Sequence, residues 1–129
     1  MPTLYIVSTP IGNLEDITLR ALRVLGEVGL IAAEDTRVTR RLLARYEIDT
    51  PLTSYHEHNK LAKIPELLSR LEEIDIALVS DAGTPGVNDP GQELVSAAAA
   101  QGYDVIGIPG ASAVTTAIST SGVAMDGFV

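Results

Sequence analysis

Short apolar runs alternate with helix-forming stretches along the whole chain, and this alternation constrains the fold more than any other feature of the sequence. The apolar runs predict strands at Thr3 to Ser8, Val28 to Ala33, Leu52 to Tyr55, Asp75 to Ser80 and Tyr103 to Ile108. Helical spacing predicts helices at Asp16 to Leu25, Thr36 to Tyr46, Asn59 to Glu73, Pro90 to Gln101 and Ala111 to Ser121. Repeated strand–helix units of this kind predict an α/β fold, a parallel sheet with right-handed crossovers and helices on both faces.

Three residues give local signals for where these helices begin, end or break. Asp16 is a candidate N-cap of the first helix, and Gly102 is typical of the C′ residue that ends the fourth. Pro65 interrupts the apolar stripe of the third helix. We therefore expect that helix to start afresh or to kink at Pro65.

The composition limits the chain to one core and excludes several kinds of chemistry. At 129 residues and 46% hydrophobic content we expect a single domain. The absence of cysteine excludes disulfides, thiolate catalysis and Cys-ligated zinc. There is no run of about 18 apolar residues and no basic start after Met1, so we expect neither membrane insertion nor export but a cytoplasmic location. The apolar end at Phe128 and Val129 leads us to expect a chain cut at a domain boundary.

Loops with polar, glycine and proline residues follow four of the predicted strands, at Ser8 to Leu14, Glu34 to Arg37, Ser80 to Gly91 and Pro109 to Ala113. The loop from Ser80 to Gly91 has neither the Gly-Lys-Ser/Thr ending of a P-loop nor the spacing of a dinucleotide fingerprint. In a parallel sheet all of these loops open at the same edge. Because open α/β sheets bind ligands at that edge, we expect the functional site there.

Acidic and histidine residues in or near these loops are candidates for proton transfer. Glu34 and Asp35 together form a possible general base or metal pair, although Asp35 is equally suited to cap the helix that follows, an interpretation that we favour. His56 and His58 suggest a metal site, but nothing in the sequence specifies the third protein ligand that zinc needs. We therefore expect no metal, and a surface histidine that contacts substrate.

Serine residues lie at three of the strand ends, at Ser8, Ser80 and Ser112. None belongs to a nucleophile elbow of the G-x-S-x-G type. We expect them to donate hydrogen bonds to a ligand rather than to act as nucleophiles.

Arginine residues recur at steps of four at Arg37, Arg41 and Arg45, which places them on one face of the predicted helix. The net charge of −8 argues against a phosphate-binding surface over the whole chain, so any nucleic-acid contact has to be local or shared with another segment. A solvated helix face and a local phosphate-binding stripe both remain open on this pattern.

The ordered set of loops resembles the tetrapyrrole methylase superfamily, and more closely its ribosomal RNA branch, the small-subunit methyltransferase I family. The matching stretches are Thr9 to Leu14, Asp16 to Ala21, Ala33 to Arg37, Ser80 to Gly86, Asp89 to Gly91 and Pro109 to Ala113. The third loop reads Gly83-Thr84-Pro85 where corrin and porphyrin relatives have Gly-Asp-Pro. Backbone contacts, rather than an Asp contact, are implied there.

The resemblance implies an S-adenosylmethionine-dependent methyltransferase of two α/β domains, of which residues 1–129 form the N-terminal one and the C-terminal one is absent. It implies 2′-O-methylation of a cytidine in 16S ribosomal RNA of the small ribosomal subunit, and an isolated domain that is inactive. Glu34, Asp35 and His56 are candidate bases, Arg37, Arg41 and Arg45 would contact RNA phosphates, and the family makes a homodimer expected. The implied cofactor-binding residues are Pro10, Ala82, Gly83, Thr84, Val87, Ser112 and Ala113.

Two alternatives share the predicted fold. One is a methylase that acts on a corrin or porphyrin macrocycle, and the other is a non-enzymatic nucleotide-binding module. The fold alone does not separate them, because function depends on the site that the fold carries.

Overall fold

The computed structural model describes residues 2–10, 14–79 and 91–110. In this part of the chain five parallel strands form one sheet: β1 (Thr3–Val7), β2 (Leu30–Ala33), β3 (Leu52–Ser54), β4 (Ile76–Val79) and β5 (Asp104–Ile108). The helices are α1 (Leu19–Glu27), α2 (Thr36–Arg45), α3 (Lys60–Leu71) and α4 (Gly91–Ala100), with a short 3₁₀ turn, η1, at Leu14–Asp16. The α/β prediction is confirmed, whereas the predicted helix from Ala111 to Ser121 lies outside the described residues.

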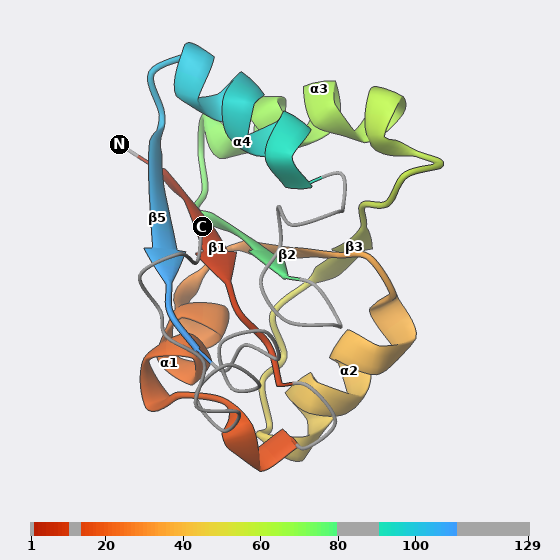
Figure 1. Cartoon of the computed structure of the whole chain (residues 1–129), viewed down its shortest axis with the longest axis vertical. Helices are drawn as coiled ribbons and strands as arrows, with labels where there is room; N and C mark the ends of the chain where they lie inside the picture. The colour runs from red at the N-terminus through yellow and green to blue at the C-terminus, as the bar shows by residue number, and fades with distance from the viewer. Residues whose placement is uncertain (1, 11–13, 80–90, 111–129) are drawn as a thin grey trace, which may run out of the picture.

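The strand order is β3-β2-β4-β1-β5, and the helices that connect the strands divide between the two faces of the sheet (Figure 1). From β1 to β3 the chain moves in one direction across the sheet through α1 and α2. From β3 to β5 it returns through α3 and α4, and it inserts β4 between β2 and β1. Right-handed connections that move in opposite directions across a sheet place their helices on opposite faces of that sheet, as observed here.

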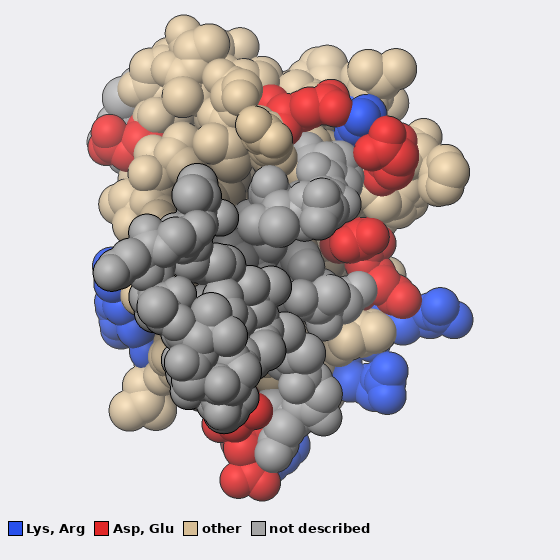
Figure 2. Space-filling view, viewed as in Figure 1, with Lys and Arg blue, Asp and Glu red and all other residues tan. Residues whose placement is uncertain are grey.

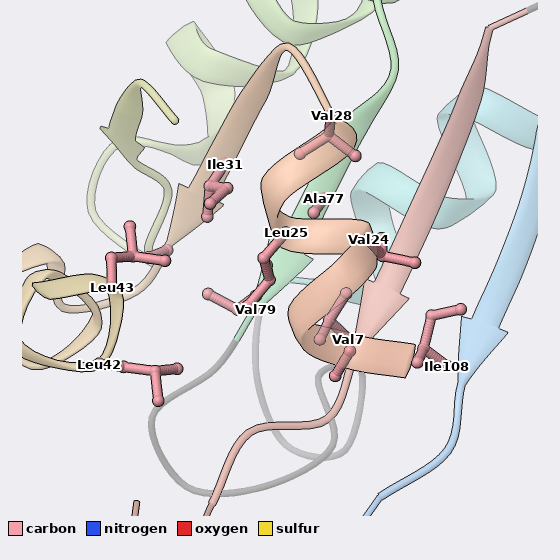
Figure 3. Close-up of a cluster of buried hydrophobic side chains, with 12 residues drawn as sticks. Val7, Val24, Leu25, Val28, Ile31, Leu42, Leu43, Ala77, Val79 and Ile108 are labelled. Atoms are coloured by element: carbon pink, nitrogen blue, oxygen red, sulfur yellow. The ribbon is translucent and has the colours of Figure 1, made fainter. Parts of the chain in front are cut away.

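Each face of the sheet has its own apolar core. On the α1 and α2 side, buried side chains from these helices meet those of the strands (Figure 3), and the cluster comprises Val7, Ala21, Val24, Leu25, Val28, Ile31, Ala33, Leu42, Leu43, Ala77, Val79 and Ile108. On the other side, α3 and α4 cover Leu4, Leu30, Ala32, Tyr55, Leu67, Leu71, Ile76, Leu78, Leu94 and Ala98. Burial on both faces explains why the strands are almost wholly apolar in sequence.

The start of α1 differs from the prediction. The hydroxyl of Thr18, not the carboxylate of Asp16, caps the helix by accepting the Ala21 N–H at 3.0 Å. Asp16 instead ends η1, so the helix begins three residues later at Leu19. At the other end, Val28 is the C-cap of α1 and donates its N–H to the Val24 carbonyl, so β2 begins at Leu30 rather than at Val28.

Two further helix signals have clear outcomes. Gly102 adopts a φ of +86°, and the N–H of Tyr103 reaches back to the Ala98 carbonyl at 3.1 Å, which confirms the predicted glycine termination of α4. Pro65 lies inside α3 and does not divide it. The prediction of a fresh start at Pro65 was therefore wrong. The carbonyl left without its partner belongs to Leu61, a residue that is 82% exposed, so water can hydrate that carbonyl.

Candidate functional site

The carboxyl ends of the central strands lie side by side at one edge of the sheet, which we call the rim. Val7, the last residue of β1, pairs with Val79 at the end of β4 and with Ile108 at the end of β5. Ala33 at the end of β2 is in turn opposite Val79. The prediction that loops far apart in the sequence emerge together is confirmed for the strand ends. Of the predicted cofactor-binding residues, Ala82, Gly83, Thr84, Val87, Ser112 and Ala113 lie outside the described residues.

A shallow, open and mostly apolar pocket of about 350 Å³ lies where β1 and β5 reach the rim. Gly110 approaches Ser8 so closely that an added Cβ would stand 3.0 Å from the Ser8 Cβ, and only a residue without a side chain fits there undistorted. Ser8 is buried, with its N–H directed at the Ile108 carbonyl at 3.4 Å. The lining residues are Ile6, Ser8, Gly107, Ile108, Pro109 and Gly110.

Pro10 is buried on the other side of β1, against α2. It lines a much smaller cavity, about 20 Å³, together with Thr9, Leu14, Val38, Thr39 and Leu42. The 3₁₀ turn η1 is tied to the end of α2, because the Tyr46 hydroxyl donates to the Leu14 carbonyl at 2.7 Å. Pro10 and Ser8 therefore face different neighbours although they are only two residues apart.

The two acidic residues after β2 have different environments. Asp35 is the N-cap of α2, and its Oδ1 accepts the Arg37 backbone N–H at 2.9 Å, so the capping prediction is confirmed. That N–H, assisted by the Arg37 guanidinium, lowers the pKa of the Asp35 carboxyl below its usual value of 3.8. A carboxylate held in this way is a weaker proton acceptor. Glu34 is exposed at the rim, and the described part of the chain offers its carboxylate no hydrogen-bond partner.

A hydrogen-bonded turn carries His56 from the end of β3 into α3. The Tyr55 N–H donates to the Ala33 carbonyl at 2.9 Å, so β3 and β2 stay paired up to the residue before His56. The His58 N–H donates to Nδ1 of His56 at 3.2 Å, and the two imidazole rings lie edge to face, 5.9 Å apart. Across residues 2–10, 14–79 and 91–110, no three His, Asp or Glu side chains are grouped to hold a metal ion.

The predicted arginine stripe is exposed to solvent on α2. Arg37, Arg41 and Arg45 are exposed, while Thr39, Leu42 and Leu43 pack inward, as the spacing predicts. Because α2 begins at the rim and runs away from it, Arg37 lies nearest the rim and Arg45 roughly 12 Å further along the helix axis. Basic side chains stand at the flank over α2 and at the opposite flank over α1 (Figure 2).

The amino-acid sequence matches a known family over almost its whole length. Residues 3–128 match the family model described as Tetrapyrrole (Corrin/Porphyrin) Methylases. The chain belongs to the tetrapyrrole methylase family. The five-stranded sheet and four helices of the described residues correspond to the N-terminal half of tetrapyrrole methylase structures.

Within this family the chain is most informatively compared with proteins named ribosomal RNA small subunit methyltransferase I. The one from Synechocystis sp. is 55% identical over 130 residues, which cover 100% of this chain and 47% of that protein. The one from Halalkalibacterium halodurans is 55% identical over 127 residues, which cover 98% of this chain and 44% of that protein. The chain thus spans less than half the length of these two relatives.

Solved structures of other proteins share the fold at low sequence identity. Uroporphyrin-III-C-methyltransferase from Thermus thermophilus superimposes with a TM-score of 0.72 at 24% identity, over 97% of this chain and 54% of that one. A diphthine synthase superimposes with a TM-score of 0.75 at 15% identity, over 96% of this chain and 50% of that one. At these identities the likeness establishes the fold alone.

Two residues that organise the rim were not identified from the sequence. Asn59 holds the His56 turn together, and the signal for it is an Asn immediately before a helix, which favours turns as well as caps. Lys60 joins that turn to α4, since its Nζ lies 2.9 Å from Glu57 Oε1 and 2.6 Å from Glu93 Oε1. The carboxylates of Glu93 and Glu57 raise the pKa of Lys60, so it stays charged.

No helix in the described ranges is both long enough and apolar enough to cross a bilayer.

Proposed function

We propose that residues 1–129 are the N-terminal α/β domain of an S-adenosylmethionine-dependent methyltransferase that methylates the 2′-hydroxyl of a cytidine in 16S ribosomal RNA. The observation that carries this proposal is the 55% identity, over the whole chain, to a ribosomal RNA small subunit methyltransferase I. In this proposal a C-terminal domain completes the enzyme, and the isolated domain is inactive because half of the cleft is missing. A cytoplasmic homodimer is part of the same proposal.

The cofactor site is proposed at the rim, on loops that follow β1, β4 and β5. The pocket at β1 and β5 supports it, because about 350 Å³ of mostly apolar space beside a glycine backbone suits part of a nucleoside-sized group. When bound, S-adenosylmethionine supplies an activated methyl group on its sulfonium. The proposed lining residues are Pro10, Ala82, Gly83, Thr84, Val87, Ser112 and Ala113.

The protein's own part in the reaction is to position the ribose hydroxyl and to accept its proton. Glu34 is the best placed of the three candidate bases, because it is exposed at the rim and within the described residues no other group engages its carboxylate. Asp35 is committed to capping α2 and its pKa is lowered, which disfavours it as a base. His56 stands one strand away from Glu34, in the turn that follows β3.

The stripe formed by Arg37, Arg41 and Arg45 is proposed to contact RNA phosphates. Its exposure along one side of α2, starting at the rim, would let a strand leave the site over a basic surface. The net charge of −8 requires this attraction to be local, with further positive charge from the second domain or subunit.

The proposal is tested by methyl transfer from S-adenosylmethionine to unmodified small ribosomal subunits, with the full-length enzyme. The triple substitution Arg37→Ala, Arg41→Ala and Arg45→Ala is expected to abolish RNA methylation and to leave cofactor affinity unchanged. A matched control removes the same charge from exposed positions elsewhere, through Arg20→Ala, Arg23→Ala and Arg70→Ala.

Three results would count against this function. Equal losses in the stripe variant and its control would remove the special role of α2. No methyl transfer by the wild-type enzyme would contradict an RNA substrate. Methylation of a corrin or porphyrin in its place would identify a macrocycle as the substrate.

A further inference from the structure

The turn between β3 and α3 is built around the side-chain amide of Asn59. Its Oδ1 accepts the His56 N–H at 2.8 Å, and its Nδ2 donates to Ser54, to the hydroxyl at 3.0 Å and to the carbonyl at 3.4 Å. The Asn59 backbone N–H also donates to the His56 carbonyl at 3.2 Å. These partners settle which way the amide points, since an N–H needs the amide oxygen and a carbonyl needs the amide nitrogen. Asn59 thereby fixes the backbone on both sides of His56.

The same turn fixes the hydrogen on the His56 ring. Nδ1 accepts the His58 backbone N–H at 3.2 Å, so Nδ1 presents a lone pair and carries no hydrogen. A neutral imidazole then has its hydrogen on Nε2. Within the described ranges, no protein group forms a hydrogen bond with Nε2, and the residue is only half-buried. The ring therefore presents an unused Nε2–H donor.

The location of this donor ties it to the rim. His56 follows β3, which pairs with β2, and Glu34 follows β2. The imidazole and the Glu34 carboxylate thus leave neighbouring strands at the same edge of the sheet. Lys60 makes the turn more rigid, because its side chain connects Glu57 in the turn to Glu93 on α4 and is only 18% exposed.

We infer that His56 is a hydrogen-bond donor to an acceptor oxygen of the substrate strand, and that Asn59 and the His58 backbone N–H are the groups that position it. A ring with its hydrogen already on Nε2 cannot accept a proton there, which leaves Glu34 as the proton acceptor. The identity of the ligand as an RNA strand rests on the proposed function. The orientation and tautomer of the ring do not.

The tautomer is measured by long-range ¹H–¹⁵N NMR of the full-length protein labelled at histidine. We expect the ¹⁵N shifts of wild-type His56 to show hydrogen on Nε2 and none on Nδ1 at a pH where the ring is neutral. His58→Ala keeps the backbone N–H and should leave these shifts in place, whereas His58→Pro removes that N–H and should mix the two tautomers. Asn59→Ala should also mix them, and Asn59→Asp, which keeps the Oδ1 acceptor, should restore most of the wild-type pattern.

The donor role is measured by RNA methylation. In His56→Gln the amide nitrogen takes the place of Nε2–H but cannot act as a base, so we expect its KM for small subunits to stay within about threefold of wild type. His56→Asn and His56→Ala lack a donor at that position, and we expect a rise in KM of roughly three- to tenfold, the effect of one neutral hydrogen bond, with kcat little changed.

The outcomes distinguish a hydrogen-bond donor at Nε2 of His56 from the other tautomer and from a general base. Hydrogen on Nδ1 in the wild-type protein would overturn the inference. So would a His56→Gln enzyme as inactive as His56→Ala, with the loss in kcat, because that pattern identifies a base. An inactive wild-type enzyme would refute the proposed function, while the ¹⁵N shifts would still establish or exclude the Nε2–H donor.

Discussion

Gly29 and Gly26 lie three residues apart, and alanine at these two positions should change stability in opposite directions. An added Cβ at Gly29 would stand 2.8 Å from the Cβ of Ile74, closer than folded proteins allow. Ile74 cannot move away easily, because its neighbour Asp75 accepts the Gly29 N–H at 3.0 Å through its carbonyl and the Thr3 N–H at 2.7 Å through Oδ1. The starts of β1, β2 and β4 are therefore locked together around this contact.

Overpacking of a rigid site by one methyl group costs about 1–3 kcal/mol, and the lower backbone entropy of unfolded alanine offsets about 0.4–1 kcal/mol of that. We expect Gly29→Ala to lower the free energy of unfolding by about 1–2 kcal/mol. Gly26 lies inside α1, with open space around its Cβ position, so Gly26→Ala should raise that free energy by about 0.5–1 kcal/mol.

Urea denaturation measures both effects. With a slope of about 2 kcal/mol per molar, the midpoint of Gly29→Ala should fall by roughly 0.5–1 M and that of Gly26→Ala should rise by roughly 0.3–0.5 M. Midpoint shifts of the same sign would show that the contact with Ile74 relaxes freely, and would refute the reasoning. An altered slope in either variant would mean that the comparison no longer reports on this contact.

Two other predictions concern helix starts. Thr18→Ala should lower the free energy of unfolding by about 1 kcal/mol, because it removes the hydroxyl that accepts the Ala21 N–H. Asp16 is exposed, so Asp16→Ala should change that free energy by less than about 0.5 kcal/mol. A larger loss from Asp16→Ala in thermal or urea unfolding would identify Asp16 as the cap. For Asp35 the folded-state pKa lies below the usual 3.8, so its charge stabilises the fold above that pH and this stabilisation is lost as the pH falls through the lowered value. Asp35→Asn keeps a capping oxygen without the charge, so the stability advantage of wild type over this variant should be present at pH 7 and shrink below about pH 4; an advantage that grows on acidification would contradict the sign of the shift.

The sequence predicted the kind of fold because each strand–helix unit carries its own local signal. Every described strand lies within two residues of its predicted bounds, and the predicted termination at Gly102 is present. The strand order could not be predicted, since it depends on which face each helix covers, a property of the packed helices rather than of any one segment. No local sequence pattern predicts that β4 is inserted between β1 and β2.

The candidate site was predictable in outline but not in its hydrogen bonds. Convergence of the loops follows from parallel strands alone, and it includes the loop of Glu34, whereas His56 was identified from the spacing of His56 and His58 and from the family resemblance. The role of each side chain depends on partners that spacing does not reveal. The sequence does not say which ring nitrogen of His56 carries the hydrogen, and the contact between the His58 backbone N–H and Nδ1 decides this. Asn59 has only the signal of an ordinary helix start in the sequence, and its hydrogen bond to the His56 N–H is visible only in the structure.

The position of β1 in the sheet has a consequence for synthesis of the chain. Its backbone partners are β4 and β5, and both are made after residue 75. A nascent chain that has emerged only through α3 therefore holds its first strand with no neighbour to pair with. The part of the rim formed by β1, β4 and β5 cannot assemble until Ile76 to Val79 have left the ribosome, which makes closure of this sheet a late, non-local event in folding.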